Sequence, residues 1–352
     1  MNPIYRGQYP PKNTDVLWIK DNQIYIYQNG GWASVSNSII KDAEDHLSET
    51  SEKLIKNRAV YNQYMDKDDI DDVISGFYPY SSQYLTFKIL SDGNISWAAQ
   101  NTSPIYYSKN GGEWTVLNIN STLVVVEGDI VRFKASNLTI PDSSNVGFRY
   151  STCSYDVYGN IMSLVNADSF DGTSDITGIS FVKLFIDNKI VNAKNLILPA
   201  TTLTSECYSN MFYNNRMLKT APELPATTLA NACYIQMFKK CISLEKAPEL
   251  PATTLAQNCY SGMFEDCNSL TEAPELKAAT LQKYCYRYMF QNCTNLSFIK
   301  CTATNISASS CLTDWTKNVS STGTFVKAST MNSWPSGKSG IPSGWTIQDA
   351  SE

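Results

Sequence analysis

The chain of 352 residues contains little of the chemistry on which most enzymes depend. It has one histidine, His46, and neither a glycine-rich phosphate loop nor a nucleophile-elbow motif occurs in it. Because histidine is the commonest general base in hydrolytic mechanisms, its scarcity argues against most of them. We therefore expect no catalytic residue, no cofactor and no enzymatic activity, and we interpret His46 as a solvated surface residue.

Clustered positive charge and long apolar runs are also missing. The 28 lysines and arginines are outnumbered by 33 acidic residues, and the net charge is −5. Contacts to phosphates need clustered cations, so nucleic-acid binding is not expected. No apolar run approaches a length of about 18 residues, which a membrane-spanning helix needs. The first six residues do not resemble a secretory signal, so we expect neither membrane insertion nor signal-directed export.

The sequence does contain an internal repeat with a period of 26 residues. Four copies begin at Leu198, Leu224, Leu250 and Leu276, and a decaying fifth copy keeps Cys311. A degenerate copy at residues 181–185 precedes the array. The constant columns are Leu203, Leu229, Leu255, Leu281; Cys207, Cys233, Cys259, Cys285; Met211, Met237, Met263, Met289; Phe212, Phe238, Phe264, Phe290; and Leu218, Leu244, Leu270, Leu296. One copy cannot bury its own apolar face, so the repeat predicts a stacked solenoid over residues 166–315.

The spacing inside each copy predicts local structure. Leu203, Cys207 and Met211 recur four residues apart, which indicates an apolar stripe on a short helix. Residues 218–221 are then expected to form a short strand that ends at Pro222, because proline cannot donate a hydrogen bond to a sheet.

Eight of the ten cysteines fall into two repeat columns. A metal site would favour a Cys-x-x-Cys spacing or a histidine partner, and neither occurs, so no metal site is expected. We favour buried, reduced thiols that act as small apolar residues, and disulfides between some of them are the alternative.

The repeat consensus LPATTLxxxCYxxMFxxCxxLxxAPE resembles the BspA-like leucine-rich repeats of surface proteins of gut bacteria and of proteins of their phages. The resemblance extends upstream to residues 158–164 and downstream to residues 319–325 and 333–337, and it covers roughly residues 80–352. It implies a role in binding or surface display.

The N-terminal third has a different composition. Residues 15–20, 23–28 and 31–35 alternate and predict a small β anchor over residues 1–35. Residues 36–76 predict a coiled-coil-like helical neck, with the acidic run 66–72 as a solvated linker. We expect the neck to form a homo-oligomer, with a trimer favoured, and a single helix packed on the sheet is the alternative. The predicted oligomerisation residues are Ile40, Ala43, Leu47, Leu54, Tyr61 and Tyr64.

Alternating runs between turn signals predict a β-sandwich over residues 77–165, and residues 316–352 are expected to cap the solenoid. The fold class is therefore mixed but mainly β: a small β anchor, an oligomeric helical neck, a β-sandwich and a C-terminal leucine-rich-repeat solenoid. A stacked acidic column, formed by Glu223, Glu249 and Glu275, is interpreted as a solvated face, and a cation or sugar rim is the alternative.

Residues 13–18 and 29–32 are similar to the start of virion proteins from phages of gut bacteria, the crAss-like group among them. This resemblance implies a head fibre or decoration protein that is located in the virion and attached through its N-terminal region to capsid or tail proteins. A bacterial cell-surface adhesin is the first alternative, and a glycan-cleaving enzyme is a weaker one.

The positions that differ between copies are the candidates for recognition. Residues in constant columns must fit the same slot, whereas residues that vary are free of that constraint and are expected to point outward. The candidate face for a host-surface glycan or protein consists of Tyr213, Lys239, Glu265, Gln291, Arg287 and Tyr288. Plain solvent exposure without a binding role is the alternative.

Overall fold

The computed structural model describes residues 80–98, 105–136 and 147–350, together with four short strands nearer the N-terminus. The chain divides into two compact units, Met1–Pro79 and Tyr80–Glu352. The predicted neck lies outside the described residues, and so do His46, the acidic run and all six predicted oligomerisation residues.

A four-stranded sheet is the described part of the first unit. It contains β1 (Tyr5–Arg6), β2 (Trp18–Lys20), β3 (Gln23–Gln28) and β4 (Gly31–Ser34), in that order. The three predicted strands are confirmed as β2, β3 and β4, and each pairs antiparallel with the next. The sequence analysis missed β1, which adds to β2 in parallel.

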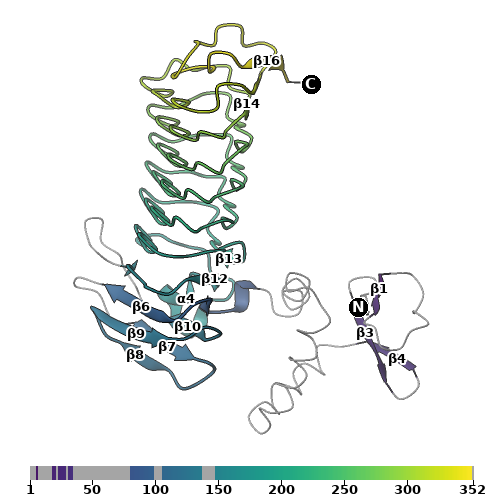
Figure 1. Cartoon of the computed structure of the whole chain (residues 1–352), viewed down its shortest axis with the longest axis vertical. Coiled ribbons are helices and arrows are strands. Elements are labelled where there is room, and N and C mark those ends of the chain that lie inside the picture. The colour runs from purple at the N-terminus through teal and green to yellow at the C-terminus, as the bar shows by residue number, and fades with distance from the viewer. Residues whose placement is uncertain are drawn as a thin grey trace. The chain divides into compact units, whose positions relative to one another are not determined.

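The second unit begins with two packed sheets (Figure 1). The alternating runs predicted over residues 77–165 are confirmed as strands: β5 (Leu85–Ile89), β6 (Gly93–Ala98), β7 (Ile105–Lys109), β8 (Thr115–Leu117), β9 (Ser121–Val125) and β10 (Ile130–Lys134). Three further strands are β11 (Gly147–Phe148), β12 (Tyr155–Asn160) and β13 (Leu196–Ile197). One sheet has the order β13-β12-β5-β10-β7-β8, and the other has the order β11-β6-β9.

Aromatic rings join these two sheets. Phe148 on β11 packs against Phe87 on β5 and Phe133 on β10, with ring centroids 4.8 and 4.7 Å apart. Trp97 on β6 contacts the same phenylalanine at 5.0 Å. All four side chains are buried, so the alternation in the sequence places one face of each sheet in a shared aromatic core.

Short helical segments cover little of the unit. These are the 3-10 turns η1 (Tyr80–Ser82) and η2 (Ala167–Ser169) and the helix α4 (Ser163–Asn166). The described residues are therefore mainly β, and among them no helix is long and apolar enough to cross a bilayer.

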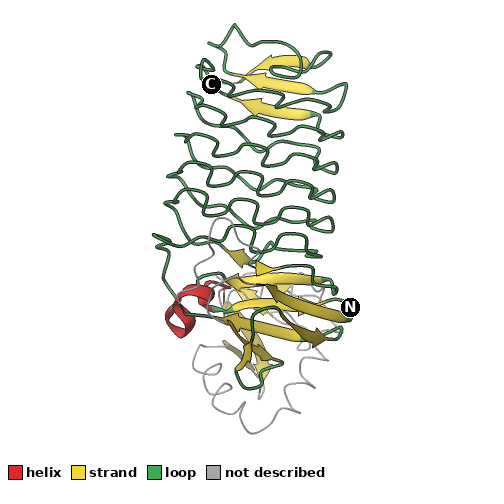
Figure 2. Ribbon diagram, turned by 90° about the vertical axis from the view of Figure 1, so that its left-hand side faces the viewer, coloured by secondary structure: helices red, strands yellow, loops and turns green. Residues whose placement is uncertain are grey.

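Beyond β13 the chain winds into coils of 26 residues stacked one on another (Figures 1 and 2). Because β13 pairs in parallel with β12, the larger sheet continues directly into this repeat stack. Two columns of rings run along its inside, with neighbouring centroids 5.4 to 6.2 Å apart, and both columns end on Trp315. The columns consist of Phe181, Tyr208, Tyr234, Tyr260, Tyr286 and of Phe185, Phe212, Phe238, Phe264, Phe290.

The predicted short helix in each copy is wrong. The segment is a chain of overlapping turns in which alternate residues bond in different directions. Tyr208 donates its N–H to Cys233 in the next coil (3.0 Å), whereas Ser209 donates to Glu206 within its own turn (2.9 Å). An α-helix would direct all these N–H groups along its own axis, so it could not link the coils. We call this side of the stack the turn ladder.

The left-handed backbone conformation recurs at every fourth residue of the turn ladder. In the first full coil, Glu206, Asn210 and Asn214 have φ angles of 60°, 54° and 60°. This region is costly for residues with a Cβ, and asparagine tolerates it better than most. The repeated turn is therefore maintained by the bonds between coils.

The predicted strand at residues 218–221 is shorter than expected. Only single bridge residues pair there, such as Thr220 with Asn192 and with Lys246. Longer strands form at the C-terminal end, where β14 (Phe298–Cys301), β15 (Thr324–Lys327) and β16 (Thr346–Asp349) make a parallel sheet. Regular β-structure thus closes the stack at this end.

Candidate binding surface

The four-residue period of the turn ladder divides its side chains into alternating pairs. In the first full coil, Cys207 and Tyr208 are buried, as are Met211 and Phe212. The pairs between and after them, 209–210 and 213–214 with their equivalents in the other coils, lie on the outward side of the ladder, where most are half-buried and Ser209, Ser261, Gly262 and Glu265 are buried. We call these outward columns the ladder surface, and all six predicted binding residues belong to it.

Glu265 lies at the centre of one outward column. Its carboxylate is 2.8 Å from the Lys239 ammonium of the preceding coil, and it accepts a hydrogen bond from Gln291 of the following coil at 3.3 Å. Glu265 is only 7% exposed. The structure therefore brings these three predicted residues together, and they pack on one another rather than extending separately into solvent.

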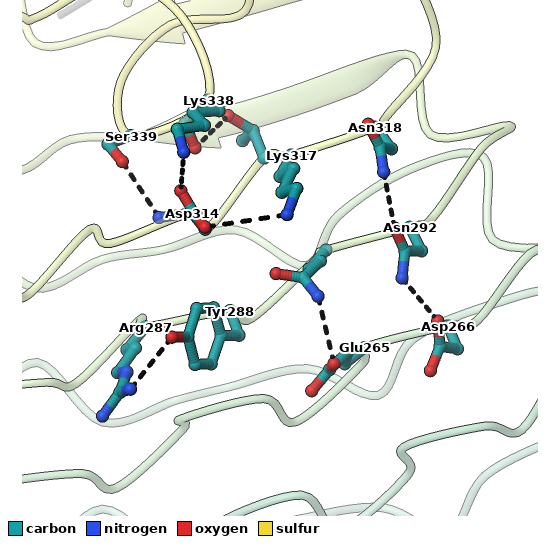
Figure 3. Close-up of polar contacts among 12 residues, drawn as sticks. Glu265, Asp266, Arg287, Tyr288, Asn292, Asp314, Lys317, Asn318, Lys338 and Ser339 are labelled. Carbon is teal, nitrogen blue, oxygen red and sulfur yellow. Dashed lines mark hydrogen bonds and ion pairs between the residues drawn. The ribbon is translucent and has the colours of Figure 1, made fainter.

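In the neighbouring column, amide and carboxylate side chains of successive coils are joined by hydrogen bonds. Asn292 donates a hydrogen bond to Asp266 at 2.7 Å and accepts one from Asn318 at 2.8 Å (Figure 3). Asn214 donates in the same way to Asp187 at 2.8 Å, and the Lys240 ammonium lies 5.5 Å from the ring centre of Tyr213. These residues fix the edge of the ladder surface, and the sequence analysis selected only Tyr213 among them.

Arg287 lies between two tyrosine rings. Its guanidinium carbon is 4.5 Å from the ring centre of Tyr288 and 5.3 Å from that of Tyr284. Its Nη2 donates to the Tyr288 hydroxyl at 2.9 Å (Figure 3). The prediction named Arg287 and Tyr288 but missed Tyr284, whose position four residues before Tyr288 was the available signal.

Asp314 occupies the position in the next coil that is equivalent to Tyr288, and two lysines lie close to its carboxylate. Lys338 lies 3.0 Å from its carboxylate and Lys317 lies 3.9 Å from it (Figure 3). The backbone N–H of Asp314 also donates to the Ser339 hydroxyl at 3.0 Å. Because Lys338 and Ser339 follow the last repeat, no periodic pattern could have placed them here.

Thiols lie behind the ladder surface. All ten cysteines are free and buried, which confirms the predicted burial. Burial raises the pKa of Cys207, Cys233 and Cys285 to about 12. Thiols with such a pKa stay protonated at neutral pH, so they act as packing groups rather than nucleophiles.

The acidic column lies elsewhere in the repeat. Glu223 and Glu249 are exposed, whereas Glu275 is half-buried and pairs with Lys300 at 2.7 Å. Within the described ranges, no three His, Cys, Asp or Glu side chains come together in a group that could hold a metal ion. The ladder surface is thus the larger array of organised polar side chains, and it is our candidate site.

No family model, no curated protein and no solved structure matches this chain.

Proposed function

We propose that the repeat stack is a leucine-rich-repeat solenoid of the BspA-like kind and that its ladder surface binds the surface of a host cell. The observation that carries this proposal is the difference between inward and outward pairs. The inward Cys-Tyr and Met-Phe pairs are the same in four coils, whereas the outward residues after Phe are Tyr213, Lys239, Glu265 and Gln291. Such a scaffold can change its surface without changing its core.

The chemistry of the outward side chains suits recognition of sugars or of protein surfaces. Tyrosine offers an apolar ring face together with a hydroxyl, and tyrosine and arginine are enriched among residues that dominate binding energies. The Lys239–Glu265–Gln291 contacts hold polar groups in fixed positions, which lowers the entropy lost on binding. Binding of this kind needs no catalytic group.

For the whole chain we propose a phage virion protein, a head fibre or decoration protein. Residues 1–75 would join the copies, as a trimer in our favoured version, and attach them to capsid or tail proteins. The resemblance of residues 13–18 and 29–32 to virion proteins supports this assignment. So does the division of the chain into two units, because anchoring and recognition would then be carried by separate parts.

The test is to locate the protein during infection. Antibodies against residues 80–352 should label purified phage particles, and mass spectrometry of those particles should detect the protein. Pre-incubation of cells with the purified protein should reduce phage adsorption. Detection on the envelope of uninfected cells, with none in particles, would contradict the virion proposal and support the bacterial adhesin instead.

A further inference from the structure

Positive charge concentrates toward the C-terminal end of the repeat stack. Residues 280–340 contain six lysines and arginines and one acidic residue, Asp314, although the whole chain has a net charge of −5. Two of the six cations have acidic partners outside this range, since Lys300 pairs with Glu275 and Lys327 pairs with Asp349. The other four are Lys283, Arg287, Lys317 and Lys338. Of these, Lys317 and Lys338 pair with Asp314, the one acidic residue in the range.

Arg287 contacts two aromatic rings at once, those of Tyr284 and Tyr288. The structure records no ion pair between Arg287 and any carboxylate among the described residues, and the Nε of Arg287 is buried without a hydrogen-bond partner there. The rings of Tyr284 and Tyr288 hold its guanidinium in place, and the Lys283 ammonium lies 5.0 Å from the Tyr284 ring centre. Its charge is therefore oriented but not neutralised by a neighbouring acid.

Packing does not account for an arginine at this position. The same outward column holds Ser209, Ile235, Ser261 and Thr313 in the other coils, and the turn ladder continues through all of them. The fold thus accepts small or neutral side chains in this slot. The arginine is better explained by what it can contact from outside the protein.

We propose that Lys283, Tyr284, Arg287, Tyr288 and Lys338 form a subsite for a negatively charged sugar, and this inference rests on the proposed binding function. A guanidinium pairs with a carboxylate or sulfate through two parallel hydrogen bonds, and the two lysines add positive charge, although Lys338 shares its charge with Asp314. The tyrosine rings offer apolar faces to the C–H groups of the sugar ring. The ligand is thus an acidic saccharide unit of a surface glycan, with either a carboxylate or a sulfate as its anionic group.

The experiment is a titration of the full-length protein with three oligosaccharides of equal length: one rich in uronic acid, one sulfated and one neutral. We expect one or both acidic probes to bind more tightly than the neutral probe, with an affinity that falls as salt rises. A comparison of the affinities for the uronic-acid probe and the sulfated probe shows whether the preferred anionic group is a carboxylate or a sulfate. Arg287→Gln should weaken acidic-probe binding by about ten- to a hundredfold, the range for hydrogen bonds to charged groups. The matched control is Arg216→Gln, which removes the same charge from an exposed position in an earlier coil and should leave binding unchanged.

Equal affinity for acidic and neutral probes would overturn the inference, as would an Arg287→Gln variant that melts at the wild-type temperature and binds as tightly as wild type. Tighter binding of single-stranded nucleic acid than of either acidic sugar would overturn it too. These failures differ from failure of the proposed function. A protein that binds host cells through the ladder surface but does not prefer acidic sugars refutes only this subsite, whereas a folded protein that binds no host cell refutes the proposed function itself.

Discussion

The Cys267 thiol donates a hydrogen bond to the backbone carbonyl of Phe238 in the preceding coil, with Sγ and O 3.1 Å apart. Cys241 and Cys293 make the same bond to Phe212 and Phe264, at 3.2 and 3.0 Å. Asn215, at the start of this column, donates to Phe185 at 2.6 Å. The column therefore supplies a small donor that joins each coil to the one before it, in addition to the backbone bonds.

Replacing Cys267 by valine or threonine isolates this donor, because the two side chains have nearly the same shape. Valine already occupies the last position of the column as Val319. We expect the free energy of unfolding of Cys267→Thr to exceed that of Cys267→Val by about 1 kcal/mol, the net value of one hydrogen bond. Equilibrium urea unfolding measures the difference. A valine variant more stable than the threonine variant would show that the column needs no donor.

Alkaline pH should destabilise the repeat stack. Burial raises the pKa of Cys207, Cys233 and Cys285 to about 12, from an ordinary value of 9.0. The unfolded chain therefore loses these protons at a lower pH than the folded protein does. The associated stability is fully present below pH 9.0 and is lost as the pH rises from there toward 12. Urea unfolding at a series of pH values should show this decline, with a shallower slope for Cys233→Ala, and an unfolding free energy that stays constant above pH 9 would contradict it.

Asn292 tests the left-handed positions of the turn ladder. Its φ is 63°, and its side chain bonds to both Asp266 and Asn318. Asn292→Val places a β-branched side chain in the left-handed region and removes both bonds, so we expect a loss of about 2 kcal/mol or more of unfolding free energy. Asn292→Gly also removes both bonds, but glycine adopts the left-handed conformation without strain, so this variant should lose less unfolding free energy than Asn292→Val. Equal losses for the two variants in thermal or urea unfolding would argue against backbone strain at this position.

The sequence predicted the inward side of the repeat stack better than its local geometry. Cys207, Met211 and their equivalents were assigned to the core because identical residues at a fixed period must fill identical slots. The helix was wrong because a spacing of four fits both a helix and a chain of four-residue turns. The pairing of two inward with two outward residues, and asparagine at positions such as 210 and 292, were the signals for turns.

The candidate site shows the same limit. Arg287 and Tyr288 were predicted from their variation between copies, and so was the Lys239–Glu265–Gln291 group. Their mutual contacts were not predicted, because those contacts depend on which coil packs beside which and on side-chain orientation. Lys338 reaches Asp314 from outside the repeat, so the period carried no information about it.

The predicted neck gives a separate test of assembly. We expect Leu47→Asp combined with Leu54→Asp to convert an oligomer into a monomer, because a charge buried in an apolar seam costs several kcal/mol when it has no partner. Light scattering of the full-length variant and of wild type measures the masses. A fragment of residues 80–352, which form one compact unit, should be a folded monomer. An oligomer of the double variant or of this fragment would contradict the neck assignment.

The most direct test of the ladder surface as the recognition site is the binding of purified protein to host cells after Tyr213, Arg287 and Tyr288 are replaced together by alanine. Lys239 is left in place, because its removal would leave the buried carboxylate of Glu265 without its ion pair. The matched control replaces three exposed threonines of the same stack, Thr201, Thr227 and Thr253, by alanine. We predict that the first variant folds but loses at least about 90% of its affinity, a change of about 1.4 kcal/mol, while the control binds as wild type does. Wild-type binding by the folded first variant would contradict the central claim.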